Sequence, residues 1–275
     1  MNWFYKFLLF LQSEMETPKP YGWFHLLWIF LVIISIIYLY KIRNSYNEKQ
    51  LKKILLIYGG VAFILELLKQ IIWSFNYDTL TNIVTWDFQW YSFPFQLCTT
   101  PIYVSLICGF MKDNKIRKSL LSYLSFVTIL GSIATIIIPD SCFVSDILVN
   151  IHTMWLHCGS LVVSVYLMIV KEVKLNFDNL KKSVLVFLIF VGLAMFLNIS
   201  VYNSGILNGE SFNMFYISPY FISTLPLFCV IQEMVSYPLF LTFYVSVIIL
   251  GAFVICFLGN KSKEIIGKVN ELINI

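Results

Sequence analysis

The sequence has few charged residues and very little histidine. Of its 275 residues, 12% are Asp, Glu, Lys or Arg, three are His, and 59% are hydrophobic. A soluble domain of this length needs a charged surface, so this composition and a mean hydropathy of +0.80 exclude one. We therefore predict that the solvent around this chain is lipid.

Long stretches without charge recur along the chain. A helix needs about 20 residues to cross the ~30 Å hydrocarbon core of a bilayer at ~1.5 Å per residue. We place the spans at 22–40, 54–74, 92–111, 119–138, 148–170, 183–203 and 234–258. The predicted fold class is all-α: a single integral membrane domain over residues 1–275, a polytopic bundle of about seven transmembrane helices.

Basic residues are missing from every second joint between these spans. The joint 75–91 contains Asp78 and Asp87 but no Lys or Arg, and later joints of this kind carry Asp140, Asp146, Glu210 and Glu233. The basic residues of the other joints and the chain end are Lys41, Arg43, Lys49, Lys52, Lys53, Lys112, Lys115, Arg117, Lys118, Lys171, Lys174, Lys181, Lys182, Lys261, Lys263 and Lys268. By the positive-inside rule, the N-terminus is outside and the C-terminus inside.

Two segments outside the spans stand out. Residues 1–12 combine Trp3 with Lys6 and lack a small-residue cleavage pattern, which favours an interfacial segment. The joint 204–233 is long and rich in Asn, Phe, Tyr and Pro, so it is a candidate outer lid. Within it, 217–232 is apolar but short, which leaves open whether it re-enters the membrane.

Ionisable residues inside the spans gather at one depth. Glu66, Lys69 and Gln70 lie at i, i+3 and i+4 on the second span, so they share a helix face roughly 6–12 Å from its outer end. No acidic, basic or His residue falls in the inner half of any span under this assignment. Ionisable side chains are energetically unfavourable in lipid, so this layer is a candidate functional site.

Three other spans contribute polar side chains to the same layer. Cys98 is placed ~9 Å into the third span with Gln96 just above it, His152 and His157 lie ~6 and ~13 Å into the fifth, and Asn198 lies ~7 Å from the end of the sixth. Pro101 follows Cys98 and deprives the Leu97 carbonyl of its helical partner, which predicts a kink beside the thiol.

Three interpretations of this layer remain open. In the structural one, Glu66 and Lys69 form an internal ion pair and Cys98 is a packing residue. In the catalytic one, a histidine deprotonates Cys98 and the thiolate attacks an ester carbonyl. A metal site from Cys98, His152, His157 and Cys158 is weaker, because residues five apart on a helix point about 140° away from each other.

The residues also resemble a family, the YwaF-type integral membrane proteins, over nearly the whole chain. The resemblance rests on the run Glu66–Gln70 (ELLKQ), the segment Pro94–Cys98 (PFQLC), His157 with the apolar run after it, and Asn208–Phe215 (NGESFNMF), which includes Asn213. Eukaryotic relatives of this family are transmembrane acyltransferases that act on ether phospholipids. More distant lipid hydrolases of similar fold carry Thr where this chain has Cys98.

The resemblance implies a thiol acyltransferase that uses phospholipid and lysophospholipid substrates in the outer leaflet. Cys98 would be the nucleophile and His157 the general base, with His152 as the alternative. Gln96 would help to stabilise an oxyanion. Lys69 would bind a lipid phosphate or form an ion pair with Glu66. A non-enzymatic lipid- or signal-binding protein, a transporter and a lipid ester hydrolase are the alternatives.

The expected partners are the bilayer and its lipids. We expect no cofactor, no metal and no nucleic acid, and the sequence does not indicate an oligomeric state. The chain ends without a retention signal, so the expected location is a cell membrane, with a bacterial plasma membrane as the best fit.

Overall fold

The computed structural model describes residues 2–139 and 142–273, except for the side chains of 260 and 262–273. Asp140 and the side chains of Lys263 and Lys268 thus lie outside the described part. The described helices are α1 (Trp3–Leu11), α2 (Trp23–Lys41), α3 (Glu48–Ser74), α4 (Thr100–Phe110), α5 (Lys115–Tyr123), α6 (Ile129–Ile137), α7 (Ile147–Ile169), α8 (Phe177–Asn203), α9 (Phe228–Met234) and α10 (Tyr237–Ile273).

Six helices in the described part are long and apolar enough to cross a membrane. They are α2, α3, the continuous helix Lys115–Ile137 that contains α5 and α6, α7, α8 and the segment Tyr237–Gly259 of α10. The prediction of a multi-pass helical bundle is therefore confirmed. The predicted third span, 92–111, differs: its helix is the shorter α4, of 11 residues.

The structure corrects the predicted surroundings of Cys98. Pro101 lies in the first turn of α4, where the missing N–H has no intrahelical partner to lose, so it begins the helix and does not kink it. The Leu97 carbonyl accepts a hydrogen bond of 2.8 Å from the Thr100 hydroxyl. Cys98 consequently lies on the turn before the helix, and not inside a span.

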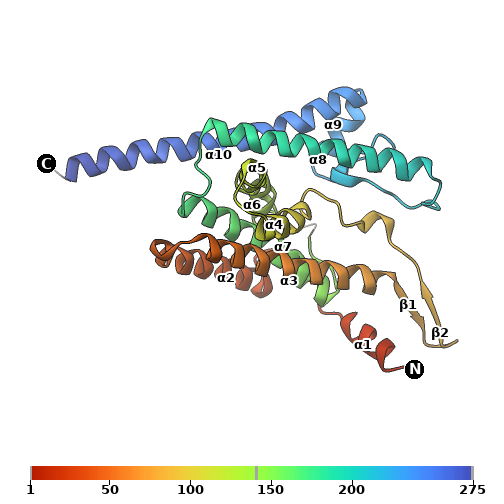
Figure 1. Cartoon of the computed structure of the whole chain (residues 1–275). Coiled ribbons are helices and arrows are strands. Elements are labelled where there is room, and N and C mark those ends of the chain that lie inside the picture. Colours follow the sequence, from red (N-terminus) through yellow and green to blue (C-terminus); the bar gives the residue numbers. More distant parts are fainter. Residues whose placement is uncertain (1, 140–141, 274–275) are drawn as a thin grey trace.

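The bundle has three groups of helices (Figure 1). α2 and α3 form one side, α8 and α10 the opposite side, and α4 to α7 lie between them. The central helix is buried where α5 meets α6, in a π-helical segment, Leu124–Thr128. There the Thr128 hydroxyl donates to the Leu124 carbonyl, which also accepts from Ser164 of α7 at 2.6 Å. Neighbouring helices thus satisfy the irregular backbone, as a membrane interior requires.

One end of the bundle carries elements that the sequence did not predict. Strands β1 (Phe75–Asp78) and β2 (Ile83–Trp86) form an antiparallel hairpin directly after α3, a small exception to the all-α class. α1 lies beside it, within the segment 1–12, whose interfacial location stays a prediction (Figure 1). The Gln12 side chain fixes α1 by donating to the carbonyls of Ile72 and Phe75 at 2.7 and 2.8 Å.

The opposite end joins three of the predicted basic joints through a buried cluster. Arg117, 1% exposed, donates from Nε to the Cys108 carbonyl at 2.9 Å, and its Nη1 lies 3.6 Å from Glu172 Oε1. The Tyr46 hydroxyl hydrogen-bonds to the same carboxylate, and burial together with Glu172 raises the pKa of Tyr46. Arg117 was predicted to lie in a joint, and the structure places it in the first turn of the continuous helix Lys115–Ile137.

The predicted outer joints meet at the other end of the bundle. The Trp90 amide donates to Glu210 Oε2 at 2.8 Å, which ties the joint after α3 to the joint after α8. Residues 13–15 pair with the segment before α7 through Met15 N to Ser145 O at 2.9 Å. The alternating joints therefore segregate to two ends, as the charge pattern predicts; which end is cytoplasmic remains a prediction.

Candidate functional site

A buried ionic network occupies the half of α3 nearer the hairpin. Lys69 Nζ lies 2.7 Å from Glu66 Oε1, and Gln70 Nε2 donates to the same oxygen at 2.9 Å. Glu66 Oε2 lies 2.8 Å from His152 Nε2 of α7, the distance of an ion pair, and neither atom has a hydrogen-bond partner among the described residues. Glu66, Lys69 and His152 are 2%, 8% and 4% exposed. Four of the predicted site residues therefore form one cluster.

Ser92 extends this network to the segment before Cys98. Gln70 Nε2 also donates to the Ser92 carbonyl at 2.7 Å, and the Ser92 hydroxyl lies 3.3 Å from Gln70 Oε1. The Gln70 amide thereby joins the ion pair of α3 to the chain that leads toward α4. The sequence analysis did not single out Ser92, because a serine outside a span carries no signal of its own.

A second group of amide side chains holds the long joint between α8 and α10. Gln96 Nε2 donates to the Asn213 carbonyl at 3.0 Å while its Oε1 accepts from Phe215 N at 2.8 Å. Asn198 makes the equivalent pair with Met214: Nδ2 to the carbonyl at 3.0 Å and N to Oδ1 at 2.7 Å. The oxygen and the nitrogen of each amide are both engaged, so Gln96 acts here as a clamp; a role for its second N–H at an oxyanion stays a prediction.

The clamped segment is buried and has unusual backbone angles. Phe215 and Tyr216 have φ of 59° and 60°, the left-handed region that residues other than glycine rarely enter. Phe212, Met214 and Phe215 are fully buried. The Asn213 side chain accepts from Ser218 N at 2.7 Å and donates to the Phe221 carbonyl at 3.3 Å. Strain of about 1–3 kcal/mol per residue persists only where surroundings enforce it, which is typical of functional sites.

Cys98 lies between these two groups, on a half-buried turn. The turn is closed by Thr99, whose hydroxyl accepts from Gln96 N at 2.8 Å. The thiol is close enough to Lys69 and Glu66 to interact electrostatically with both. Burial favours the neutral thiol, whereas a nearby ammonium and the N-terminus of α4 favour the thiolate. The structure therefore brings Cys98 to the ionic network that the sequence placed in the same layer.

The two histidines of α7 differ in their surroundings. His152 faces Glu66, with its Nε2 at 2.8 Å from the carboxylate. His157 is 9% exposed and close enough to His152 for an electrostatic interaction. Among the described residues, no hydrogen bond joins the Cys98 thiol to either imidazole. The choice of base therefore remains a prediction.

Several tyrosines around Cys98 were not predicted as site residues. The hydroxyls of Tyr58, Tyr123 and Tyr216 lie within electrostatic reach of the thiol. Tyr123 shares a hydrogen bond of 2.7 Å with Thr100, and Tyr58 donates to the Leu156 carbonyl at 3.0 Å. Tyrosine is common at membrane interfaces, so its count in the sequence gave no signal for these three. No three His, Cys, Asp or Glu side chains of the described part are grouped as metal ligands.

Six candidate spans around a buried polar layer define a polytopic helical membrane protein. A family model agrees with this class: that of the TMEM164 family, a transmembrane family, matches residues 20–262. The chain therefore belongs to the TMEM164 family. Comparison with curated proteins and with solved structures gives no match.

Proposed function

We propose that this protein is a membrane-embedded acyltransferase that moves a fatty acyl chain from a phospholipid to a lysophospholipid through a thioester on Cys98. The observation that carries the proposal is the position of Cys98. It lies before the N-terminus of α4 and within electrostatic reach of the Lys69–Glu66 pair, and no side chain of the described part forms a hydrogen bond with its thiol. The ammonium and the helix N-terminus favour the thiolate against the effect of burial, and a base that takes the proton would complete the activation of a nucleophilic thiol.

The resemblance to the YwaF-type proteins and to the ether-phospholipid acyltransferases supports the choice of chemistry. Each segment that carries it lies in or beside the candidate site: Glu66–Gln70 in the ionic network, Pro94–Cys98 on the turn, His157 on α7, and Asn208–Phe215 in the clamped joint. A phospholipid ester is also the acyl donor that a bilayer already supplies.

The proposed reaction has two steps. His157 accepts the Cys98 proton, and the thiolate sulfur attacks the ester carbonyl carbon of the donor. Collapse of the tetrahedral intermediate breaks the carbon–oxygen bond, and the lysophospholipid alkoxide takes the proton from His157. A hydroxyl of the acceptor lysophospholipid then loses its proton to His157 and attacks the thioester carbon. The Cys98 thiolate leaves and is protonated again.

Water in place of the acceptor would give a free fatty acid, so the hydrolase alternative differs only in the second step. The ion pair of Glu66 with Lys69 keeps an ammonium near the thiol, and His152 positions that pair. We further propose that the hairpin end faces the outside of a cell membrane, with the bacterial plasma membrane as the best fit to the basic joints.

A transfer assay in proteoliposomes tests this proposal. A phospholipid with an isotopically labelled acyl chain serves as donor, a lysophospholipid as acceptor, and mass spectrometry counts labelled product. We expect product from the wild type, none from Cys98→Ala, and wild-type amounts from Cys256→Ala, which removes a buried thiol of α10. Full transfer by Cys98→Ala would overturn the mechanism. Labelled free fatty acid in place of product would assign the hydrolase.

One observation favours a non-enzymatic lipid- or signal-binding protein as the second candidate. Three of the predicted site residues, Gln96, Asn198 and Asn213, use their amides to hold backbone of the α8–α10 joint. A binding protein needs such a rigid joint and no reactive thiol. It predicts that a fatty-acyl electrophile labels Cys98 no faster than Cys229, which is also half-buried.

A further inference from the structure

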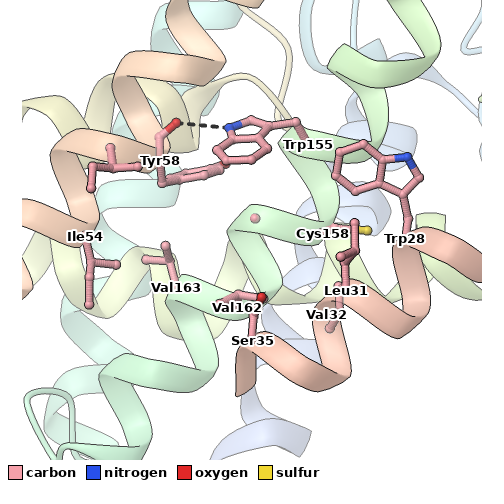
Figure 2. Close-up of a pocket in the computed structure, with 12 residues that line it drawn as sticks. Trp28, Leu31, Val32, Ser35, Ile54, Tyr58, Trp155, Cys158, Val162 and Val163 are labelled. Carbon is pink, nitrogen blue, oxygen red and sulfur yellow. Dashed lines mark hydrogen bonds between the residues drawn. The ribbon is translucent and has the colours of Figure 1, made fainter. Parts of the chain in front are cut away.

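An apolar groove lies between α2, α3 and α7, and none of its lining residues has a role in the proposed acyl-transfer steps. Its volume is about 310 Å³, in the lower part of the ~300–1,000 Å³ range of small-molecule sites. Trp28 and Ser35 of α2, Tyr58 of α3, and Trp155 and Val162 of α7 contribute to its lining (Figure 2).

The groove runs along the helices. Trp28 and Ser35 are seven residues apart on α2, as are Trp155 and Val162 on α7, so the lined length is about 10 Å at ~1.5 Å per residue. Figure 2 shows both tryptophans and Tyr58 at one end, and Ser35 and Val162 toward the other. The tryptophan end is the one nearer His152, because α7 continues from His152 through Trp155 to Val162.

The wall of the groove presents hydrocarbon. The indole N–H of Trp155 donates to the backbone carbonyl of Tyr58 at 3.3 Å, so its polar atom is already engaged and its ring remains as a surface (Figure 2). The Tyr58 hydroxyl points to the Leu156 carbonyl, 3.0 Å away. Gly159 makes this arrangement possible, since a Cβ there would lie 2.6 Å from the Tyr58 ring.

Two features identify the occupant. Lining residues Leu31 and Ile57 are 42% and 51% exposed on candidate spans, so the groove is continuous with the lipid-facing surface. Tyr58 lines the groove and is also within electrostatic reach of Cys98, so the groove and the candidate nucleophile share a neighbouring side chain. A ligand that enters from the bilayer and fits an apolar slot of this size is a hydrocarbon chain.

We propose that the groove binds one acyl chain of a bilayer phospholipid and holds its ester end toward Cys98. The proposal rests on the acyltransferase function for the role of the chain, but not for its binding. Burial of methylene groups against the two tryptophans and Val162 supplies the affinity. Ile54 and Val163 also line the groove, and its lined length of about 10 Å limits how much of the chain it contacts.

Photolabelling tests the groove separately from the chemistry. The protein is placed in phosphatidylcholine vesicles that contain a phosphatidylcholine with a diazirine on one acyl chain, irradiated, digested and mapped by mass spectrometry. We expect labelling at Trp28 and Trp155 in excess of the lipid-facing residues Leu250 and Phe253 of α10, in wild type and Cys98→Ala alike. Equal labelling of all lipid-facing helices would overturn the proposal.

Matched variants test whether lipid bound in the groove causes the excess labelling at Trp28 and Trp155. Val162→Phe fills it and lowers excess labelling about tenfold, the change expected when about two methylene groups lose their contacts. Val254→Phe makes the same substitution on an exposed face of α10 and leaves labelling unchanged. Ser35→Phe, from the opposite helix, repeats the test should Val162→Phe fail to fold. Unchanged labelling in a folded groove variant would overturn the proposal.

The two proposals fail in different ways. Excess labelling of the groove without any acyl transfer would retain the groove as a lipid site and reject the enzyme. Acyl transfer with uniform labelling would retain the enzyme and reject the groove. If both hold, Val162→Phe shifts the acyl chains transferred from a mixed-length phospholipid pool toward shorter ones, whereas Val254→Phe does not.

Discussion

Glu66 of α3 and His152 of α7 place a carboxylate oxygen and an imidazole nitrogen 2.8 Å apart within the membrane-spanning bundle. The same carboxylate holds Lys69 at 2.7 Å, so one acidic group serves two partners from two helices. A buried charge of this kind is costly without its partners and well tolerated with them. This arrangement keeps an ammonium within electrostatic reach of Cys98.

Removal of Glu66 alone should destabilise the protein. Glu66→Ala leaves the Lys69 ammonium buried without a counter-charge, and we expect a loss of about 3–5 kcal/mol in the free energy of unfolding. The double variant Glu66→Leu with Lys69→Leu removes both charges and should cost much less. Denaturant unfolding in detergent measures both. A single variant as stable as the double one would contradict the pairing.

Gln96 should be needed to hold the α8–α10 joint. Gln96→Ala leaves the buried Phe215 N–H and Asn213 carbonyl without their partner, at about 1–3 kcal/mol for each unsatisfied group. Gln96→Glu keeps the acceptor for Phe215 and should lose less. Limited proteolysis within 204–216 reports the opening of the joint. Equal cleavage of wild type and Gln96→Ala would show that the clamp has no role.

The β1–β2 hairpin should lose stability at low pH. Hydrogen bonds from Thr81 and from the Leu80 amide hold the pKa of Asp78 below its usual value. The pKa of Asp in an unfolded chain is about 3.9, and a lower pKa in the folded protein adds stability at pH values above that. The added stability is lost as the pH falls through the pKa of the folded protein. Amide exchange at Leu80, compared with Asp78→Asn, measures it. The variant should show no extra loss of protection on acidification.

The two histidines should contribute unequally to acyl transfer. His157→Ala removes the proposed general base, and we expect the rate to fall about 10²–10⁴-fold. His152→Ala acts only by disturbing Glu66 and Lys69, so a smaller fall is expected, together with reduced stability. Rates and unfolding midpoints of both variants decide the roles. The reverse order of rates, with both proteins folded, would assign the base to His152.

Membrane sidedness can be tested at two joints. Thr81→Cys in the hairpin and Lys112→Cys before α5 each add an exposed thiol at opposite predicted sides. A membrane-impermeant maleimide added to intact cells should label the first, and the second only after permeabilisation. The opposite result would reverse the orientation inferred from the basic joints.

The sequence predicted the long helices because lipid imposes their length and hydropathy directly. It also predicted the shared face of Glu66, Lys69 and Gln70, since helical spacing determines it. The prediction of a third span at 92–111 was wrong because the apolar residues before Cys98 have the composition of a membrane helix. Their backbone is instead held by distant side chains: Trp90 by Glu210 and Ser92 by Gln70.

The details of the site depend on packing that no local pattern records. Depth alone placed His152 and Glu66 in one layer, but their contact requires that α3 and α7 pack together. The partners of Gln96 and Asn198 are backbone atoms more than ten residues away in the chain, so residue types cannot reveal them. Arg117 was assigned to a joint because its charge is common there, whereas its burial follows from Glu172 and the Cys108 carbonyl.

Intact-mass analysis of the purified protein tests the central claim most directly. The protein is incubated with phospholipid vesicles without a lysophospholipid acceptor, so that a thioester accumulates. We predict a mass increase of one acyl group that hydroxylamine removes, in wild type and Cys256→Ala but not in Cys98→Ala. An adduct that persists in Cys98→Ala, or no adduct on a folded wild type that turns over donor, would contradict a thioester on Cys98.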